Sequence, residues 1–388
     1  MAEGQRFRVA IGCQGGGSHT AFTAGVLQSL IGDRRVEVRA LSGTSGGAVC
    51  AVAAWSGLVG RSSKAGRKVA AERLETIWQQ NRTPWWAWPA ETFLLASLRL
   101  GGSMGMSPEI SAYRNPFEAH RAFLRLMDTV PFEELTPDRV GPGDPRLLIS
   151  AVDVRTGEFR VFRSHRLFGN PPDQITGEVV LASAALPTVF RAVHLGEGVY
   201  WDGGFSQNPP LRELIPAARR DVPEGRLGAV EAGGGDPAST STTTDLEPVE
   251  LWVIQINPQT WTVEPTSMDD IRDRRNELSG NISYLQEIDA IAHMNRLILG
   301  GHLTEAARQV YAPVKVRVIT MAADLAESLD YESKLARSPA LIDRLLTHGR
   351  ERGQLFLSQL ASTDRDTLTA LPNRDIWGRW TGRASTPA

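Results

Sequence analysis

The fold is decided by the stretch VEVRALSGTSGG, Val36–Gly47. Its apolar first half predicts a strand, and its second half has the pattern G-x-S-x-G, which is typical of a serine on a sharp turn between a strand and a helix. Such a turn strains the serine backbone, and glycines around it avoid collisions with the neighbouring strand and helix. The glycines of this predicted nucleophile elbow are Gly43, Gly46 and Gly47. We interpret Ser45 as the nucleophile, at the N-terminus of a buried helix whose backbone amides favour developing negative charge.

A second glycine-rich turn lies upstream of the elbow. Phe7–Cys13 predicts a short buried strand, and residues 21–30 predict a helix. The glycines between them expose backbone amides that can bind an oxyanion or a phosphate. The residues of this predicted oxyanion loop are Gly15, Gly16, Gly17 and Ser18. A strand–helix–strand crossover over residues 7–41 would bring both turns to one edge of a parallel sheet, where open α/β sheets bind ligands.

The spacing of these glycines argues against a nucleotide site. A dinucleotide-binding loop, G-x-G-x-x-G, would need a glycine where the chain has Thr20. The second strand also ends in Leu41 and Ser42 rather than in an acidic residue that could hold a ribose. The P-loop pattern fails as well, because no Gly-Lys-Ser/Thr follows.

The candidate base is an aspartate at the end of another predicted strand. Residues 199–201 lead into Asp202, which is followed by two glycines. A carboxylate in a partly dry site has a raised pKa and accepts a proton from a hydroxyl more readily. The alternative is an ordinary surface turn, where Asp-Gly is common. Asp153 is a rival carboxylate at a strand end, but it lacks the Gly-Gly context and is interpreted as structural.

These three motifs, in this order along the chain, resemble those of the patatin-like phospholipase family. The match covers about the first two-thirds of the sequence, including the segment 181–190 before the aspartate. The resemblance implies an α/β fold, a three-layer α/β/α sandwich with a mainly parallel central sheet. It also implies a Ser–Asp dyad, in which Ser45 attacks an acyl carbonyl and Asp202 takes and returns the proton. The loop Gly15–Ser18 would supply the oxyanion hole, with no cofactor and no metal.

The oxyanion loop departs from the family pattern at two positions. The family usually continues G-G-G-x-Arg/Lys-Gly, whereas here His19 replaces the cation and Thr20 replaces the glycine. As a modulator of the site, a neutral histidine would weaken the positive potential near an anionic substrate and add pH sensitivity in the physiological range. The alternative is that His19 only packs or caps the helix start. The departure also favours a second hypothesis, a non-catalytic binding or regulatory protein that retains the scaffold.

A histidine or a metal could in principle replace the dyad. His293, His302 and His348 follow Asp202 in the order of a Ser–Asp–His triad. No catalytic loop pattern surrounds them, so the dyad is preferred and the triad stays as the minor alternative. The sequence has no H-E-x-x-H motif, no paired C-x-x-C and no tight His/Asp cluster, so no metal site is predicted.

Composition sets the protein class. The 388 residues are 41% hydrophobic, as expected of a globular protein with a sizeable core. A formal net charge of −2 argues against a nucleic-acid partner. The first residues contain no apolar signal core, and no stretch is long and uncharged enough to span a bilayer. Cys13 and Cys50 form no disulfide framework and are predicted to pack in the core, so we expect a cytoplasmic protein.

The domain organisation is predicted as one acyl hydrolase domain, 6–323, with a C-terminal helical extension and tail, 324–388. A helical, Trp-rich cap is expected at about 64–130, and a flexible insertion at about 221–249. Three tryptophans in Trp85–Trp88 would line an acyl pocket or contact a membrane peripherally, since Trp is favoured at lipid surfaces. The alternative is that they pack on the main body.

The sequence therefore predicts a serine acyl hydrolase acting on esters of lipids, of the phospholipase A type. The expected partner is a lipid or another apolar ester. Because the dyad does not dictate the acyl group, a hydroxyalkanoate polyester or a peptide remains an alternative substrate.

Overall fold

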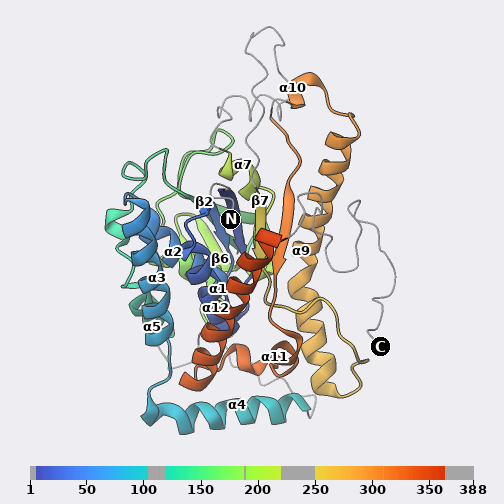
Figure 1. Cartoon of the computed structure of the whole chain (residues 1–388). Coiled ribbons are helices and arrows are strands. Elements are labelled where there is room, and N and C mark those ends of the chain that lie inside the picture. The colour runs from blue at the N-terminus through green and yellow to red at the C-terminus, as the bar shows by residue number, and fades with distance from the viewer. Residues whose placement is uncertain are drawn as a thin grey trace.

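Apolar strands from three parts of the chain form an eight-stranded sheet through the middle of the molecule (Figure 1). The computed structural model describes residues 6–103, 113, 119–187, 189–219, 250–308 and 310–362. The strands are β1 (Phe7–Cys13), β2 (Val36–Gly43), β3 (Arg146–Asp153), β4 (Phe159–Arg163), β5 (Val193–Leu195), β6 (Gly198–Asp202), β7 (Glu250–Ile254) and β8 (Lys315–Ile319). Their order is β5-β6-β3-β2-β1-β7-β8, and β4 pairs with β3. Strands β3, β2, β1, β7 and β8 pair in parallel, while β4, β5 and β6 pair antiparallel.

Helices cover both faces of the sheet, which confirms the expected three-layer sandwich. The first face is covered by α1 (Ala21–Gly32), α2 (Gly46–Leu58), α3 (Ser63–Gln80), α6 (Gly177–Ala184) and α12 (Pro339–Ser362). The second face is covered by α7 (Leu214–Ala218) and α9 (Met268–Leu299). The remaining helices are α4 (Trp88–Ser103), α5 (Ala119–Met127), α10 (Glu305–Arg308) and α11 (Ala323–Glu327). Short 3-10 turns are η1 (Gly17–Thr20), η2 (Trp85–Ala87), η3 (Phe132–Glu134), η4 (Gly203–Phe205) and η5 (Glu332–Lys334).

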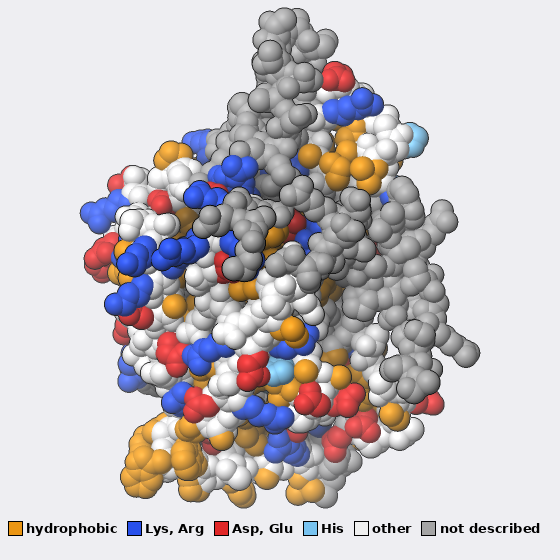
Figure 2. Space-filling view, viewed as in Figure 1, with side chains coloured by type: hydrophobic (Ala, Val, Ile, Leu, Met, Phe, Trp, Pro, Cys, Tyr) orange, Lys and Arg blue, Asp and Glu red, His pale blue; other side chains and the backbone are white. Residues whose placement is uncertain are grey.

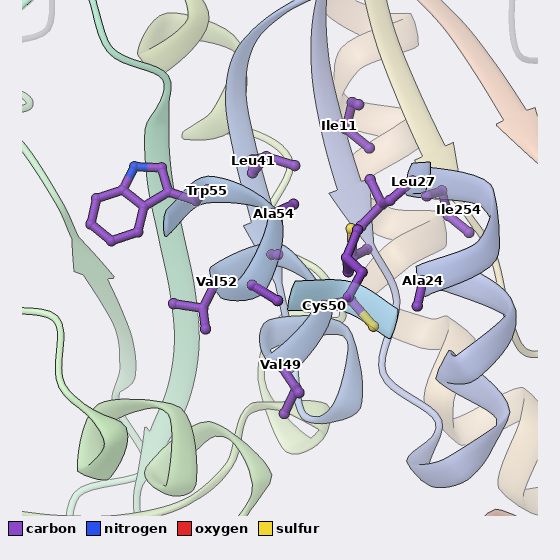
Figure 3. Packing of buried hydrophobic residues seen from close by; sticks show 14 of the residues in the cluster. Ile11, Ala24, Leu27, Leu41, Val49, Cys50, Val52, Ala54, Trp55 and Ile254 are labelled. Atoms are coloured by element: carbon purple, nitrogen blue, oxygen red, sulfur yellow. The ribbon is translucent and has the colours of Figure 1, made fainter. Parts of the chain in front are cut away.

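Alternation along the central strands builds a separate core on each side of the sheet. In β1, Val9 and Ile11 belong to the core under α1 and α2, whereas Ala10 belongs to the core under α7 and α9. Figure 3 shows Cys50 of α2 close to the side chains that β1 and α1 contribute. Both faces are covered by helices, so β1 is apolar and buried from Val9 to Cys13 rather than alternating with polar residues.

The C-terminal helix α12 is part of this core rather than an appendage. Its residues Ile342, Leu345 and Leu346 are buried in the same cluster as the α1 side chains. The two helices cross closely at Gly25, where an added Cβ would lie 2.1 Å from the carbonyl oxygen of Leu346. The expected boundary at 323–324 therefore separates segments that share one hydrophobic core.

Three predicted regions fall partly or wholly outside the described residues. The expected insertion at 221–249 lies outside them, as do residues 363–388 of the expected tail. Of the expected cap, α3, α4 and α5 are described. Within the described ranges, no helix is both long and apolar enough to cross a membrane.

Candidate active site

The nucleophile elbow is a strained turn between β2 and α2. Ser45 adopts φ 55° and ψ −129°, a left-handed conformation that a residue with a side chain rarely takes. Holding such a residue costs about 1–3 kcal/mol, which the surrounding structure must supply. The amide of Gly47 donates to the carbonyl of Thr44 at 2.8 Å, and the amide of Ala48 donates to the carbonyl of Ser45 at 2.9 Å. Helix α2 therefore begins immediately after the serine, which stays half-exposed.

The elbow glycines are required by close backbone approaches. A Cβ on Gly43 would lie 2.5 Å from the carbonyl oxygen of Gly47. A Cβ on Gly46 would lie 2.2 Å from Oγ1 of Thr20, and one on Gly47 would lie 2.3 Å from the carbonyl oxygen of Cys13. The strand, the elbow and the upstream glycine loop are thus packed too tightly for side chains at these positions.

Asp202 lies beside the nucleophile. It is the last residue of β6, pairs with Ala151 of β3 and is only 5% exposed. Its carboxylate accepts a hydrogen bond from the amide of Gly204 at 2.7 Å and lies beside the side chain of Ser45. Burial raises the pKa of Asp202 to about 6, although the Gly204 amide and the Ser45 side chain both favour the ionised form. The carboxylate is therefore ionised at neutral pH and more basic than an exposed aspartate.

The glycine loop approaches the serine from the other side. A Cβ on Gly15 would lie 2.9 Å from Cβ of Ser45, so only glycine fits there. The amide of Gly15, one of the predicted oxyanion donors, instead donates a hydrogen bond to the side-chain oxygen of Asn208 at 2.7 Å. Gly16 and Gly17 are half-exposed, and no group in the described part of the chain accepts a hydrogen bond from their amides. The amide of Ser18 also has no described acceptor, but Ser18 is buried, so the half-exposed Gly16 and Gly17 are the more accessible of the four predicted donors.

His19 is buried and neutral, in contrast to the expected pH sensitivity in the physiological range. Its Nε2 lies 2.7 Å from Oγ of Ser333, which itself donates to the carbonyl of Asp330, so the imidazole nitrogen is the donor. Burial, reinforced by the positive charge of Lys334, lowers the pKa of His19 to about 3. The physical reason for the difference is the packing of η5 on the loop, which excludes water from the ring. The packing alternative fits this geometry.

The other departure, Thr20, supports the loop. Its Oγ1 donates to the carbonyl of Gly17 at 2.6 Å and fills the space next to Gly46. Lys334 brings a cation close to the loop. Its backbone packs against Gly17, where an added Cβ would lie 2.3 Å from the Lys334 carbonyl oxygen, and its charge acts on His19. Its Nζ donates to Oδ1 of Asn257 at 2.9 Å, and burial lowers the pKa of Lys334. No sequence signal indicated this lysine, which is far from every motif.

The alternative catalytic groups are engaged elsewhere. The carboxylate of Asp153 accepts hydrogen bonds from the backbone amides of Arg155, Thr156 and Val199. These bonds lower the pKa of Asp153 and fit the structural role expected for it. Nε2 of His348 accepts the amide of Ala322 at 3.1 Å. Neither His293 nor His302 forms a hydrogen bond with Ser45 or Asp202 in the ranges that the structure covers.

Both cysteines are buried in the core as free thiols. Burial raises the pKa of Cys13, and it raises the pKa of Cys50 to about 12, so both thiols stay protonated in the core. Among the described residues, no group of three or more His, Cys, Asp or Glu side chains could hold a metal ion.

The sequence profile of the patatin-like phospholipases matches residues 13–215, which are just over half of the chain. The chain belongs to the patatin-like phospholipase family. The family supports a lipid-hydrolase function, and the matched region contains the oxyanion loop Gly15–Ser18, the elbow and Asp202.

Solved structures with a similar arrangement include two bacterial proteins. VipD from Legionella pneumophila is similar over 91% of this chain and 67% of its own, with 12% identity and a TM-score of 0.36. A chain of the heterodimeric ExoU–SpcU complex from the type III secretion system of Pseudomonas aeruginosa is similar over 94% of this chain, with 15% identity and a TM-score of 0.28. This chain covers 57% of that second chain, just over half of its length. Among curated proteins, none shows significant sequence similarity.

Two positioning groups of this patatin-like site were missed from the sequence. Ser183 of α6 accepts a hydrogen bond from the amide of Ser45 at 3.0 Å; it lies in the segment 181–190 that resembles the family, but that resemblance assigned it no role. Asn208 follows the Asp-Gly-Gly motif by a few residues and contacts the oxyanion loop. Its proximity to the motif was the one signal that could have found it.

Proposed function

We propose that this protein is a serine lipid acyl hydrolase that uses a Ser45–Asp202 dyad. The observation that carries the proposal is that the Ser45 side chain lies beside the buried Asp202 carboxylate and favours its ionised form, at a strained elbow where the serine stays accessible. A hydroxyl next to a carboxylate of raised pKa has the base that it needs to become a nucleophile.

The reaction proceeds in two halves. Oγ of Ser45 attacks the acyl carbonyl carbon while Asp202 takes the hydroxyl proton, and that proton passes to the departing alcohol as the ester bond breaks. A water molecule then gives its proton to Asp202 and attacks the acyl-enzyme, and the proton returns to Ser45 as the acid leaves. Each half regenerates the ionised carboxylate, so no cofactor takes part.

The oxyanion of each tetrahedral intermediate is assigned to the amides of Gly16 and Gly17. Both lie on the loop that touches Ser45 through Gly15, and neither amide has a described acceptor. One preorganised donor of this kind contributes about 3–4 kcal/mol to transition-state stabilisation. The N-terminus of α2 at Ser45 adds its partial positive charge.

The substrate is proposed to be presented by a membrane surface. Helix α4 and η2 form an apolar face along the lower edge of the molecule (Figure 2). The residues of this α4 face are Trp85, Trp86, Trp88, Phe93, Leu94 and Leu100, with exposed fractions between 46% and 75%. This exposure argues against the alternative that the tryptophans pack on the main body. Trp and Phe at this density favour a lipid interface.

The charges of α4 fit a neutral lipid surface. Between positions 85 and 100 only Glu91 and Arg99 are charged. Glu91 accepts the amide of Arg337, and Nε of Arg99 donates to Asp330 at 2.8 Å, so both charges are bonded to the loop that contains η5. The same loop packs on the oxyanion loop, which places the α4 face at the end of the molecule where the site lies. We therefore propose a cytoplasmic protein that binds membranes peripherally.

A fluorophosphonate probe tests the proposed activity, because it reacts only with an activated serine. The wild-type protein is expected to be labelled and to release fatty acid from phosphatidylcholine vesicles, and Ser45→Ala is expected to do neither while it keeps its circular dichroism spectrum. Labelling that persists in Ser45→Ala would overturn the assignment of the nucleophile. A wild-type protein that is folded but not labelled would favour a non-catalytic binding protein.

A further inference from the structure

The side chain of Asn208 connects three segments of the site. It is buried, and its Oδ1 accepts the amide of Gly15 at 2.7 Å. Its Nδ2 donates to the carbonyl of Gly280 in α9 at 3.1 Å, and its own amide donates to Oγ of Ser283 at 3.1 Å. All three contacts span more than seventy residues of sequence, so this asparagine is held by the tertiary fold and not by a local turn.

The residue before it extends the connection to the elbow. The carbonyl of Gln207 accepts hydrogen bonds from Oγ1 of Thr44, at 2.7 Å, and from Oγ of Ser150, at 2.8 Å. Nε2 of Gln207 in turn donates to the buried carboxylate of Glu287 in α9 at 2.6 Å. The segment that follows Asp202 is thus fixed against α9 on one side and against the elbow on the other.

We propose that Asn208 is a positioning residue for acyl transfer, and this rests on the proposed hydrolase function. Its carboxamide oxygen fixes the Gly15 amide, so that this amide cannot turn toward a substrate and the loop presents the Gly16 and Gly17 amides instead. Oδ1 would lie 3.1 Å from a Cβ on Gly15, and the other neighbours of that Cβ are the carbonyl oxygen of Thr44 and Cβ of Ser45, so the contact lies next to the nucleophile. Asn208 acts through the loop and does not touch the substrate.

A carboxamide suits this role better than other side chains. It offers an acceptor to Gly15 and a donor to Gly280 at the same time, and it carries no charge. A carboxylate at this position would accept the Gly15 amide equally well. Its negative charge would, however, oppose the oxyanion that forms on the same loop.

Asn295 of α9 provides a matched control. Its Oδ1 accepts the amide of Val314 and its Nδ2 donates to the carbonyl of Val314, both at 2.9 Å, so it also joins α9 to a neighbouring backbone through its carboxamide. None of these contacts involves the elbow, the oxyanion loop or Asp202. Replacing it by alanine removes the same number of side-chain hydrogen bonds as Asn208→Ala, without the connection to the site.

The test compares Asn208→Ala with Asn295→Ala, using a p-nitrophenyl ester and a trifluoromethyl ketone that forms a reversible tetrahedral adduct. Thermal unfolding is measured for both, and kinetics are recorded where both are folded. Asn208→Ala is expected to lower kcat about 10- to 100-fold and to raise the Ki of the ketone by a similar factor, with KM within about twofold. Asn295→Ala is expected to lose similar thermal stability and keep kcat and Ki.

The outcomes separate this proposal from the proposed function. If Asn208→Ala lowers kcat and raises Ki no more than Asn295→Ala does, Asn208 is only structural and the positioning role is wrong. If the wild-type protein neither hydrolyses the ester nor reacts with a fluorophosphonate, both proposals fail together. Should Asn208→Ala not fold, the nearly isosteric Asn208→Asp takes its place, and its Ki is expected to rise at least about tenfold because of the added charge.

Discussion

The amide of Ser45 donates a hydrogen bond to Oγ of Ser183, 3.0 Å away, although 138 residues separate them in the chain. The elbow turns this amide out of the regular pattern of α2, and Ser183 supplies its acceptor from α6. The strained conformation of the nucleophile is therefore stabilised by a helix that has no catalytic motif of its own.

Removing this acceptor should lower both stability and catalysis. Ser183→Ala leaves the amide of Ser45 without a partner, which costs about 1–3 kcal/mol of folding free energy. A looser nucleophile should also lower kcat by about tenfold. Ser164→Ala is the matched control, because Oγ of Ser164 accepts the amide of Leu147 at 2.9 Å in a buried place away from the elbow. Urea unfolding should show comparable losses, and equal kcat values in the two variants would contradict the role of Ser183.

The pH dependence of activity should follow Asp202. Because burial raises its pKa to about 6, the base is protonated below that pH, and kcat/KM should rise with pH through a midpoint near 6. Asp202→Asn should lower kcat by about 10³- to 10⁴-fold and abolish this midpoint. A pH–rate profile that shows no midpoint between pH 5 and 7 in the wild-type protein would argue against Asp202 as the base.

The same carboxylate should destabilise the native state at neutral pH. A folded-state pKa above the ordinary 3.8 means that the native protein binds the proton more tightly than the unfolded chain does. Stability from this group is therefore present below about pH 4 and lost as the pH rises through 6, by at most about 3 kcal/mol. Asp202→Asn cannot ionise and should be more stable than the wild type at pH 7, with the difference vanishing near pH 4. Denaturation at both pH values measures this.

His19 should change the stability of the protein with pH in the direction opposite to Asp202, over an overlapping pH range. Its folded-state pKa of about 3 lies below the ordinary 6.5, so the unfolded chain takes up the proton first and stability falls as the pH drops below 6.5. His19→Gln keeps a donor for Ser333 and cannot titrate. Its stability relative to the wild type should improve as the pH is lowered from 7 to 4, and a constant difference would mean that His19 is not kept neutral by burial.

The α4 face should bind neutral lipid. The triple variant Trp85→Ala, Trp86→Ala and Phe93→Ala removes side chains that are 70–75% exposed. Partial burial of each in a bilayer contributes roughly 1 kcal/mol or more, so binding to phosphatidylcholine vesicles in a sedimentation assay should weaken at least about tenfold. Hydrolysis of a soluble short-chain ester should not change. Phe159→Ala, which removes an aromatic ring that is 61% exposed in β4, is the control and should bind as the wild type does.

The sequence by itself determined the elbow, the glycine loop and the aspartate turn. Each is a local pattern. Around Ser45, which has a positive φ, an added Cβ on the nearby glycines would lie within 3 Å of other atoms, so only glycine fits there. The three-layer sandwich was implied by the resemblance of these motifs to the patatin-like family, and the buried stretch of β1 fits a sheet that is covered on both faces.

Only the tertiary structure decided how these local pieces work together. It engages the amide of Gly15 with Asn208, keeps His19 neutral under η5 and leaves the tryptophans of η2 exposed. Hydrogen-bond partners and burial depend on residues distant in the chain, and the local pattern of a sequence does not specify which distant group will arrive. The reactivity of Ser45 therefore depends on contacts that no single motif contains.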